Sequence, residues 1–235
     1  MMEEALRQTG SDDSPLHGFR GDRGLGAIAP VPLAASVAVS REVGARGGEI
    51  ARRLSAKIGW PVYDRDMLDY ASQDAVACAD LTADLSPLAT AWVEERMRYL
   101  QQHDLLSSED SFERYARLIL TLGAKGEAIF VGRGAGFILP RWSTLHVRVT
   151  APLNDRIVYI SQWLRLTREE AAEQVRLRTV NREAFLATCF RLPADGILHD
   201  MMLNSSALGE ELCADLIVLA LRSKQVAAPE SAEAD

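Results

Sequence analysis

The feature that most constrains the fold is a short apolar run that leads into a glycine-rich turn and then a helix. Residues 36–40 read Ser-Val-Ala-Val-Ser, which is typical of a buried strand. Three glycines follow within residues 44–48, and apolar residues of 50–58 then fall on one helical face. Strand, glycine loop and helix in this order predict an α/β fold whose first loop turns its backbone amides towards an anion. An ordinary glycine-rich turn is the alternative, because glycine patterns are weak motifs.

The rest of the chain alternates extended and helical patterns. Extended candidates lie at 60–63, 128–131 and 145–149. The apolar spacing over 65–122 is mainly helical, and Thr-Arg-Glu-Glu at 167–170 is a capping box that opens a further helix. Residues 215–220 fit either a last strand or the end of a helix. We therefore expect a mainly parallel sheet that is covered by helices on both faces.

The charge balance and the cysteines restrict the class of protein. The 235 residues carry a net charge of -7, which argues against broad binding to nucleic acid or to an anionic membrane. Cys78, Cys189 and Cys213 lack metal-binding or disulfide spacing, and no apolar run approaches the roughly 20 residues of a membrane span. We expect a cytoplasmic protein that acts on small molecules, with neither a membrane nor a nucleic-acid partner, and the oligomeric state is left open.

The two ends differ from the middle of the chain. Residues 1–30 mix Gly, Asp, Ser and Arg without periodicity, and residues 224–235 are rich in Ala and Glu. We expect both to be disordered tails on one folded domain over residues 31–223, which agrees with the size of a single large domain.

Four segments of the middle carry recognisable motifs. The first reads S-R-E, then G-x-x-G-x-E-I-A and, after a helix, G-W-P-V-Y-D-R-D. The others are A-I-F-V-G-R-G-A-G-F-I-L at 128–139, H-V-R-V-T-A-P-L-N-D-R-I at 146–157, and N-S-S at 204–206 with A-D-L-I at 214–217. Together, and in this order, they resemble the cytidylate kinase-like family over most of residues 35–222.

This resemblance implies the nucleoside monophosphate kinase fold, a three-layer α/β structure with a five-stranded parallel sheet and a P-loop. It also implies a helical acceptor-binding insertion over 65–122 and an arginine-bearing lid over about 160–195. The implied reaction transfers the γ-phosphoryl group of ATP to CMP or dCMP, with Mg²⁺ as the metal.

The resemblance places the phosphates of ATP on the glycine loop. The residues concerned are Ser40, Arg41, Gly44, Ala45, Arg46, Gly47, Gly48 and Glu49. A full P-loop has a lysine and a hydroxyl residue where this chain has Gly47 and Gly48. The family that this chain resembles generally lacks the lysine too, but it usually has glycine where this chain has Arg46. By analogy with one oxyanion-hole donor, the missing cation is worth about 3–4 kcal/mol, more than a helix N-terminus supplies. Arg46 or Arg41 would have to replace it, unless Arg46 merely faces solvent.

Two carboxylates near this loop have alternative roles. Glu49, in the first turn of the helix, either complements the helix dipole or lies beside a metal that shields it from phosphate. Glu42 is either a solvated loop charge or a partner of Arg41. The metal ligands stay unknown at this point.

The motif Gly132-Arg133-Gly134 follows a predicted buried strand at its carboxyl end, where ligands bind in open α/β sheets. The resemblance implies that Arg133 grips the acceptor phosphate with its bidentate guanidinium, and that Gly134 replaces the acid of the family's G-R-D-x-G motif. A surface arginine in a tight turn is the alternative. Asp64 is expected either near the acceptor or as the N-cap of the next helix.

The family's lid arginines fall in the basic stretch after residue 167. Arg178 and Arg182 are four residues apart, share a helical face, and are expected to act with Arg46 and Arg133 in catalysis. A solvated, charged helix is the alternative for this stretch.

Three functions fit these residues. The first is an ATP-dependent kinase of a nucleoside monophosphate, CMP or dCMP above all. The second is a regulator that binds nucleotides but has lost phosphoryl transfer, because Gly47, Gly48 and Gly134 stand at catalytic positions. The third is a kinase of another small acceptor, since the insertion over 65–122 carries no motif that names its ligand.

Overall fold

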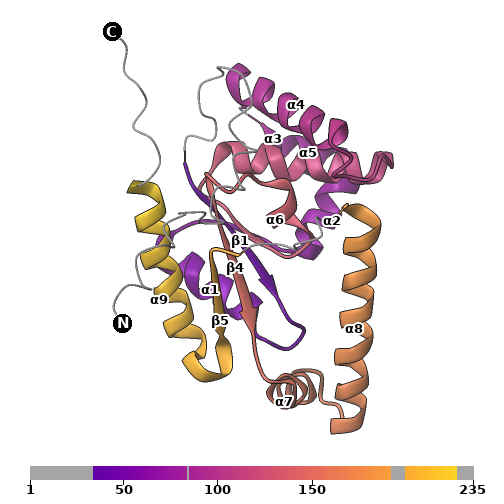
Figure 1. Cartoon of the computed structure of the whole chain (residues 1–235), viewed down its shortest axis with the longest axis vertical. Helices are drawn as coiled ribbons and strands as arrows, with labels where there is room; N and C mark the ends of the chain where they lie inside the picture. Colours follow the sequence, from indigo (N-terminus) through magenta and orange to yellow (C-terminus); the bar gives the residue numbers. More distant parts are fainter. Residues whose placement is uncertain (1–33, 84, 192–198, 227–235) are drawn as a thin grey trace, which may run out of the picture.

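The computed structural model describes residues 34–83, 85–191 and 199–226 (Figure 1). The expected tail over 1–30 lies outside the described residues. The expected tail over 224–235 is wrong for residues 224–226, because the last helix continues to Val226 and the Lys224 ammonium lies 2.8 Å from the Asp200 carboxylate. The rest of that expected tail lies outside the described residues.

Five parallel strands form one sheet in the order β2-β3-β1-β4-β5, which confirms the predicted sheet. The strands are β1 (Ser36–Arg41), β2 (Val62–Tyr63), β3 (Ile129–Val131), β4 (Thr144–Thr150) and β5 (Met201–Asn204). β1 is the central strand, so the loop that follows it emerges in the middle of the sheet.

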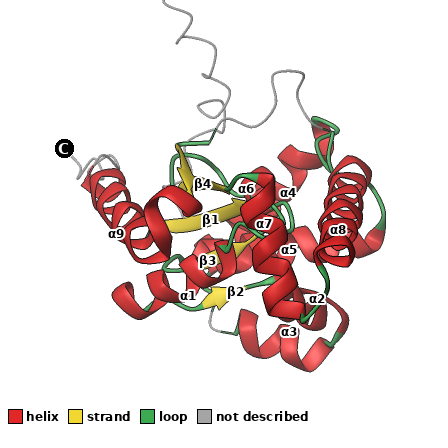
Figure 2. Cartoon of the chain, turned by 90° about the horizontal axis from the view of Figure 1, so that it is seen from below, coloured by secondary structure: helices red, strands yellow, loops and turns green. Residues whose placement is uncertain are grey.

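Helices cover both faces of the sheet. On one face lie α1 (Gly47–Ile58) and α9 (Ser205–Val226). The other face is covered by the helices of the insertion and the turn that follows β3, which are α2 (Arg65–Gln73), α3 (Ala75–Thr82), α4 (Pro87–Gln102), α5 (Asp110–Lys125) and α6 (Ala135–Ile138). In Figure 2, α9 lies on one side of the sheet and α5 lies on the other.

The alternation of side chains along β1 explains this three-layer arrangement. Val37 and Val39 point into the core under α1 and α9, while Ala38 points into the core with Phe130 of β3 under α5. All four side chains are at most 5% exposed. A parallel sheet needs such a run, because both of its faces are buried.

Two further helices stand at the edge of this unit. They are α7 (Leu153–Leu164) and α8 (Arg168–Cys189), and Figure 1 shows α7 below the sheet and α8 alongside it. The predicted capping box opens α8: the Thr167 hydroxyl accepts from the backbone amide of Glu170, whose carboxylate accepts from the Thr167 amide. Among the described residues, no helix is long and apolar enough to cross a membrane.

Residues 215–220, for which the sequence fits either a strand or the end of a helix, are helical and belong to α9. Gly209 interrupts α9 with a φ of 73°. The N-S-S motif lies at the start of this helix, where the Asn204 side chain accepts from the backbone amide of Ser206 at 3.0 Å. The Ser205 hydroxyl is buried 2.9 Å from the carbonyl oxygen of Ala45, so the motif joins α9 to the glycine loop.

Candidate functional site

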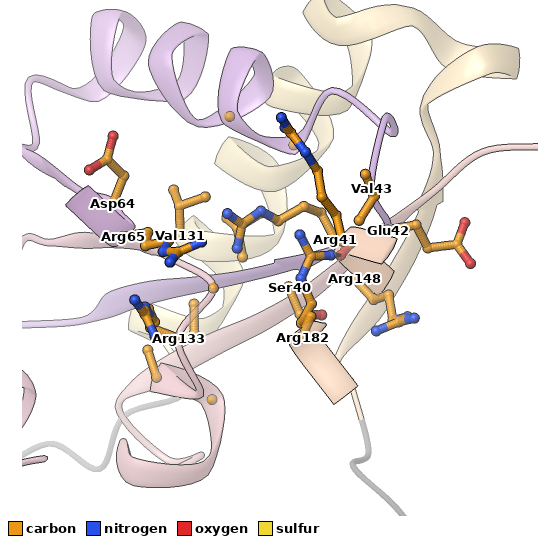
Figure 3. Close-up of a pocket in the computed structure, with 18 of the residues that line it drawn as sticks. Ser40, Arg41, Glu42, Val43, Asp64, Arg65, Val131, Arg133, Arg148 and Arg182 are labelled. Atoms are coloured by element: carbon orange, nitrogen blue, oxygen red, sulfur yellow. Dashed lines mark hydrogen bonds between the residues drawn. The ribbon is translucent and has the colours of Figure 1, made fainter. Parts of the chain in front are cut away.

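A cavity of about 860 Å³ opens at the carboxyl ends of β1 and β3. The glycine loop, the turn after β3 and α8 form its walls (Figure 3). Eight arginines line it, against four carboxylates: Arg41, Arg46, Arg52, Arg65, Arg133, Arg148, Arg178 and Arg182. An excess of positive charge in one cavity of a chain with net charge -7 indicates an anionic ligand.

Arg156 of α7 packs against the glycine loop. A Cβ atom at Gly44, where φ is 84°, would lie 2.6 Å from the Arg156 carbonyl oxygen, so only glycine fits. Arg156 donates hydrogen bonds to the carbonyl oxygens of Ala151 and Val43 at 3.0 and 3.4 Å. The backbone of the loop is thereby fixed before any ligand binds.

Glu42 has a different partner from the one that the sequence suggested. Its carboxylate accepts from the Ala151 amide at 3.1 Å and lies 3.5 Å from Arg156. The expectations of a solvated charge and of a partner for Arg41 are therefore both corrected, because Glu42 points towards the start of α7.

Arg46 caps α1 in the left-handed conformation, with φ 59°. This backbone conformation favours glycine. The Arg46 guanidinium lies 2.8 Å from the Glu210 carboxylate of α9 and 5.8 Å from the centre of the Tyr159 ring. Arg46 lines the cavity, but its charge is already paired.

The next three residues form the first turn of α1. Gly48 has no heavy atom within 4 Å of a Cβ built on it, so it faces open space in the cavity. Glu49 forms an ion pair with Arg52 one turn along the helix and also lines the cavity. Its carboxylate therefore lies near the positive end of the helix dipole.

The turn after β3 is a run of three left-handed residues, with φ values of 77°, 55° and 73° at Gly132, Arg133 and Gly134. This backbone directs the Arg133 side chain into the cavity, where it pairs with Asp69 of α2 and lies 4.5 Å from the centre of the Phe185 ring. Arg133 is thus oriented by two neighbours.

The missing acid of this motif has a steric reason. A Cβ atom on Gly134 would overlap the ring of Phe190, which follows α8. Asp64 is the N-cap of α2, since its carboxylate accepts from the Met67 amide at 3.1 Å, and it also lines the cavity. The two readings of Asp64 are therefore compatible.

Arg178 and Arg182 both reach the cavity from α8, as their spacing predicts. Arg182 donates a hydrogen bond to the backbone carbonyl of Arg41. Burial, with a smaller contribution from the charges of Arg41 and Arg148, lowers its pKa to about 10. The Arg178 guanidinium lies 5.9 Å from the centre of the Trp163 ring of α7.

Residues 36–207 match the model of the cytidylate kinase-like family. The chain belongs to this family. The match spans every strand of the sheet, the glycine loop, the turn after β3 and α8. Membership supports a kinase in the general sense for this cytidylate kinase-like chain.

Solved structures resemble this chain at low sequence identity. An uncharacterized protein from Eubacterium ventriosum is 14% identical with a TM-score of 0.59, and the match covers 80% of this chain and 99% of that one. A shikimate kinase from Acinetobacter baumannii in complex with shikimate is 11% identical with a TM-score of 0.44, covering 83% and 96%. TT1252 from Thermus thermophilus is 19% identical with a TM-score of 0.42, covering 80% and 97%. A search of curated proteins gave no match.

Sequence reasoning missed several polar residues of the cavity. Arg148 and His146 lie on the same face of β4, and the H-V-R alternation could have revealed them. His146 is 2% exposed, neither of its ring nitrogens has a partner among the described residues, and burial lowers its pKa to about 4. His199, before β5, lies 3.0 Å from the Ser40 hydroxyl.

The described residues contain no group of three or more His, Cys, Asp or Glu side chains that could hold a metal ion. Glu49 and Asp64 are carboxylates that line the cavity beside the glycine loop and the turn after β3. Mg²⁺ is commonly held by only one or two carboxylates together with the phosphates of a substrate, so this donor set fits an ion that arrives with a nucleotide.

Proposed function

We propose that this protein transfers the γ-phosphoryl group of ATP to a nucleoside monophosphate, with CMP or dCMP as the preferred acceptor. A phosphate oxygen of the acceptor forms the new bond to phosphorus, the bond to the β-phosphate oxygen breaks, and ADP leaves. The proposal combines membership of the family with the charges of the cavity.

The observation that carries it is the crowding of arginines from different elements at one place. Figure 3 shows Arg41 with Arg65 and Arg133 on one side and Arg148 and Arg182 on the other. Burial lowers the pKa of Arg41, and the charges of Arg133 and Arg65 lower it further. Such guanidiniums repel one another until an anion with several charges binds between them. A nucleoside triphosphate beside a monophosphate is such an anion pair.

The proposed roles follow the walls of the cavity. Ser40 and the loop of residues 44–49 take the phosphates of ATP, through backbone amides and the N-terminus of α1. Arg133 and Gly134 of the turn after β3 take the acceptor together with Asp64. Arg178 and Arg182 bring positive charge from the lid. Mg²⁺ would be held by Glu49 or Asp64 and would neutralise charge on the phosphates.

The regulator without phosphoryl transfer remains the second candidate. It is favoured by one observation: Gly47 and Gly48 offer neither the ammonium nor the hydroxyl of a full P-loop. A different small anionic acceptor is an outcome of the same test, because the arginines select for charge and not for a base.

A thermal-shift panel tests nucleotide binding. ATP at 100 times its Kd should stabilise the protein by about 2.7 kcal/mol, which raises Tm by roughly 5–10 °C for a chain of this size. Tripolyphosphate is the matched control, since it carries the charge without the nucleoside. Shifts from ATP and CMP that do not exceed those from tripolyphosphate and inorganic phosphate would contradict a nucleotide site.

A further inference from the structure

The stem of Arg41 occupies the space that a P-loop lysine would need. A Cβ atom at Gly47 would lie 2.7 Å from the Cβ and 3.0 Å from the Cγ of Arg41. Gly47 is buried, and its φ lies outside the left-handed region, so its backbone does not itself require glycine. Gly47 is therefore a glycine because the Arg41 side chain lies across it.

The other end of the same side chain lies on the turn after β3. A Cβ atom at Gly132 would overlap Nη1 of Arg41 and would lie 2.8 Å from its Cζ. The side chain thus runs from the first turn of α1 to the turn that carries Arg133. In the proposed reaction, these two places bind the donor phosphates and the acceptor, respectively.

The Arg41 guanidinium has no hydrogen-bond or ion-pair partner among the described residues, and the carboxylate with the largest effect on its pKa is that of Asp64. The other candidate in the loop, Arg46, is paired with Glu210. Since an unpaired, half-buried guanidinium is costly to maintain, its retention at this point calls for an anion.

We propose that Arg41 supplies the cation that a full P-loop takes from its lysine, reaching the transferred phosphoryl group from the end of β1 instead of from the start of α1. This inference rests on the proposed function. The guanidinium can donate two parallel hydrogen bonds, so Arg41 contacts the terminal phosphate of ATP from the acceptor side. The glycines at 47 and 132 make room for it.

The inference is tested by removing the charge and then moving it. Arg41→Met keeps an unbranched stem over Gly47 but removes the cation. Arg41→Gly with Gly47→Lys clears the stem and puts a lysine at the usual P-loop position. Binding of ATP and of ADP, each with Mg²⁺, is measured by calorimetry, and the ratio of the two Kd values reports contact with the terminal phosphate. Thermal unfolding shows that each variant folds.

We expect Arg41→Met to lower the preference for ATP over ADP by about tenfold or more, the loss of one charged hydrogen-bond pair. Arg41→Gly alone should show the same loss, and adding Gly47→Lys should restore most of it. Arg53→Met is the matched control in α1, since Arg53 is exposed and paired with Glu211 outside the cavity, and it should leave the ratio unchanged.

An unchanged ratio in folded Arg41→Met overturns the inference but leaves the proposed function standing. The same holds if Gly47→Lys restores nothing to Arg41→Gly, because Arg41 would then act only by packing. A wild-type protein that binds neither ATP nor ADP overturns the proposed function and this inference together.

Discussion

Arg182 of α8 donates a hydrogen bond to the backbone carbonyl of Arg41, the last residue of β1. Helix α8 is thereby joined to the start of the glycine loop. Because the hydrogen-bond acceptor is a backbone oxygen, substitution of the Arg41 side chain leaves this contact in place. The Arg182 side chain therefore links α8 to the proposed phosphate site.

Arg182→Met is expected to weaken ATP binding by roughly 10–100-fold, because Arg182 lines the cavity and its guanidinium is proposed to donate a charged hydrogen bond to a phosphate of ATP. Arg176→Met is the matched control on the same helix, because Arg176 is exposed and pairs with Glu173. Calorimetry with Mg²⁺ and ATP measures both variants. Equal effects at Arg176 and Arg182 would mean that general charge, and not the position of Arg182, governs binding.

Arg133→Ala is expected to weaken binding of the phosphoryl acceptor by roughly 10–100-fold, with ATP affinity changed much less. The reason is its place on the turn after β3, across the cavity from the glycine loop. Asp69→Asn is informative beside it, since it removes the ion-pair partner of Arg133 but keeps the arginine. The assignment to the acceptor is wrong if calorimetry finds ATP weakened and CMP untouched.

Gly134→Ala is expected to destabilise the fold by about 2–4 kcal/mol, from left-handed backbone strain and overlap with Phe190. Gly136→Ala is the control two residues away, because its Cβ would lie 3.6 Å from His146 Nδ1 in ordinary contact. Urea unfolding compares the two. If Gly134→Asp, which restores the family's acid, were as stable as wild type, the steric explanation for Gly134 would be refuted.

The lowered pKa of the buried His146 side chain predicts how the free energy of unfolding depends on pH. Its folded pKa of about 4 lies below the ordinary value of 6.5, so the unfolded chain binds the proton more readily. Above pH 6.5 His146 is neutral in the folded and the unfolded chain, so it leaves the free energy of unfolding unchanged. That free energy falls as pH drops from 6.5 towards 4, because the unfolded chain takes up the proton first. Between pH 7 and 4.5, wild type should lose about 2–3 kcal/mol more than His146→Leu in urea unfolding. Parallel losses in the two proteins would contradict the buried, neutral histidine.

The parts of the fold that depend on local pattern were predictable from sequence. The strand at 36–40, the helix after it, the capping box at Thr167 and the position of Arg133 at a strand end all follow from short-range spacing. Short-range spacing is enough there because the sequence of apolar, polar and glycine residues within each segment itself indicates its secondary structure.

The pairings within the site were not predictable, because they join residues far apart in the chain. Arg46 forms an ion pair with Glu210, and Glu42 forms one with Arg156. In each pair the partners are more than a hundred positions apart in the chain. Gly47 looks like a lost lysine in sequence, and only the path of Arg41 across it supplies a reason. Long-range packing decides these points, and one sequence does not encode them in any local spacing.

Phosphoryl transfer itself is tested most directly with ATP labelled at the γ-phosphate. Wild-type protein is incubated with labelled ATP, Mg²⁺ and CMP or dCMP, and the products are separated. We predict that the label moves to the acceptor as ADP forms, and that Arg133→Ala slows this transfer. If wild type binds ATP in the thermal-shift panel but the label stays on ATP with both acceptors, this cytidylate kinase-like chain is not a kinase of these nucleotides.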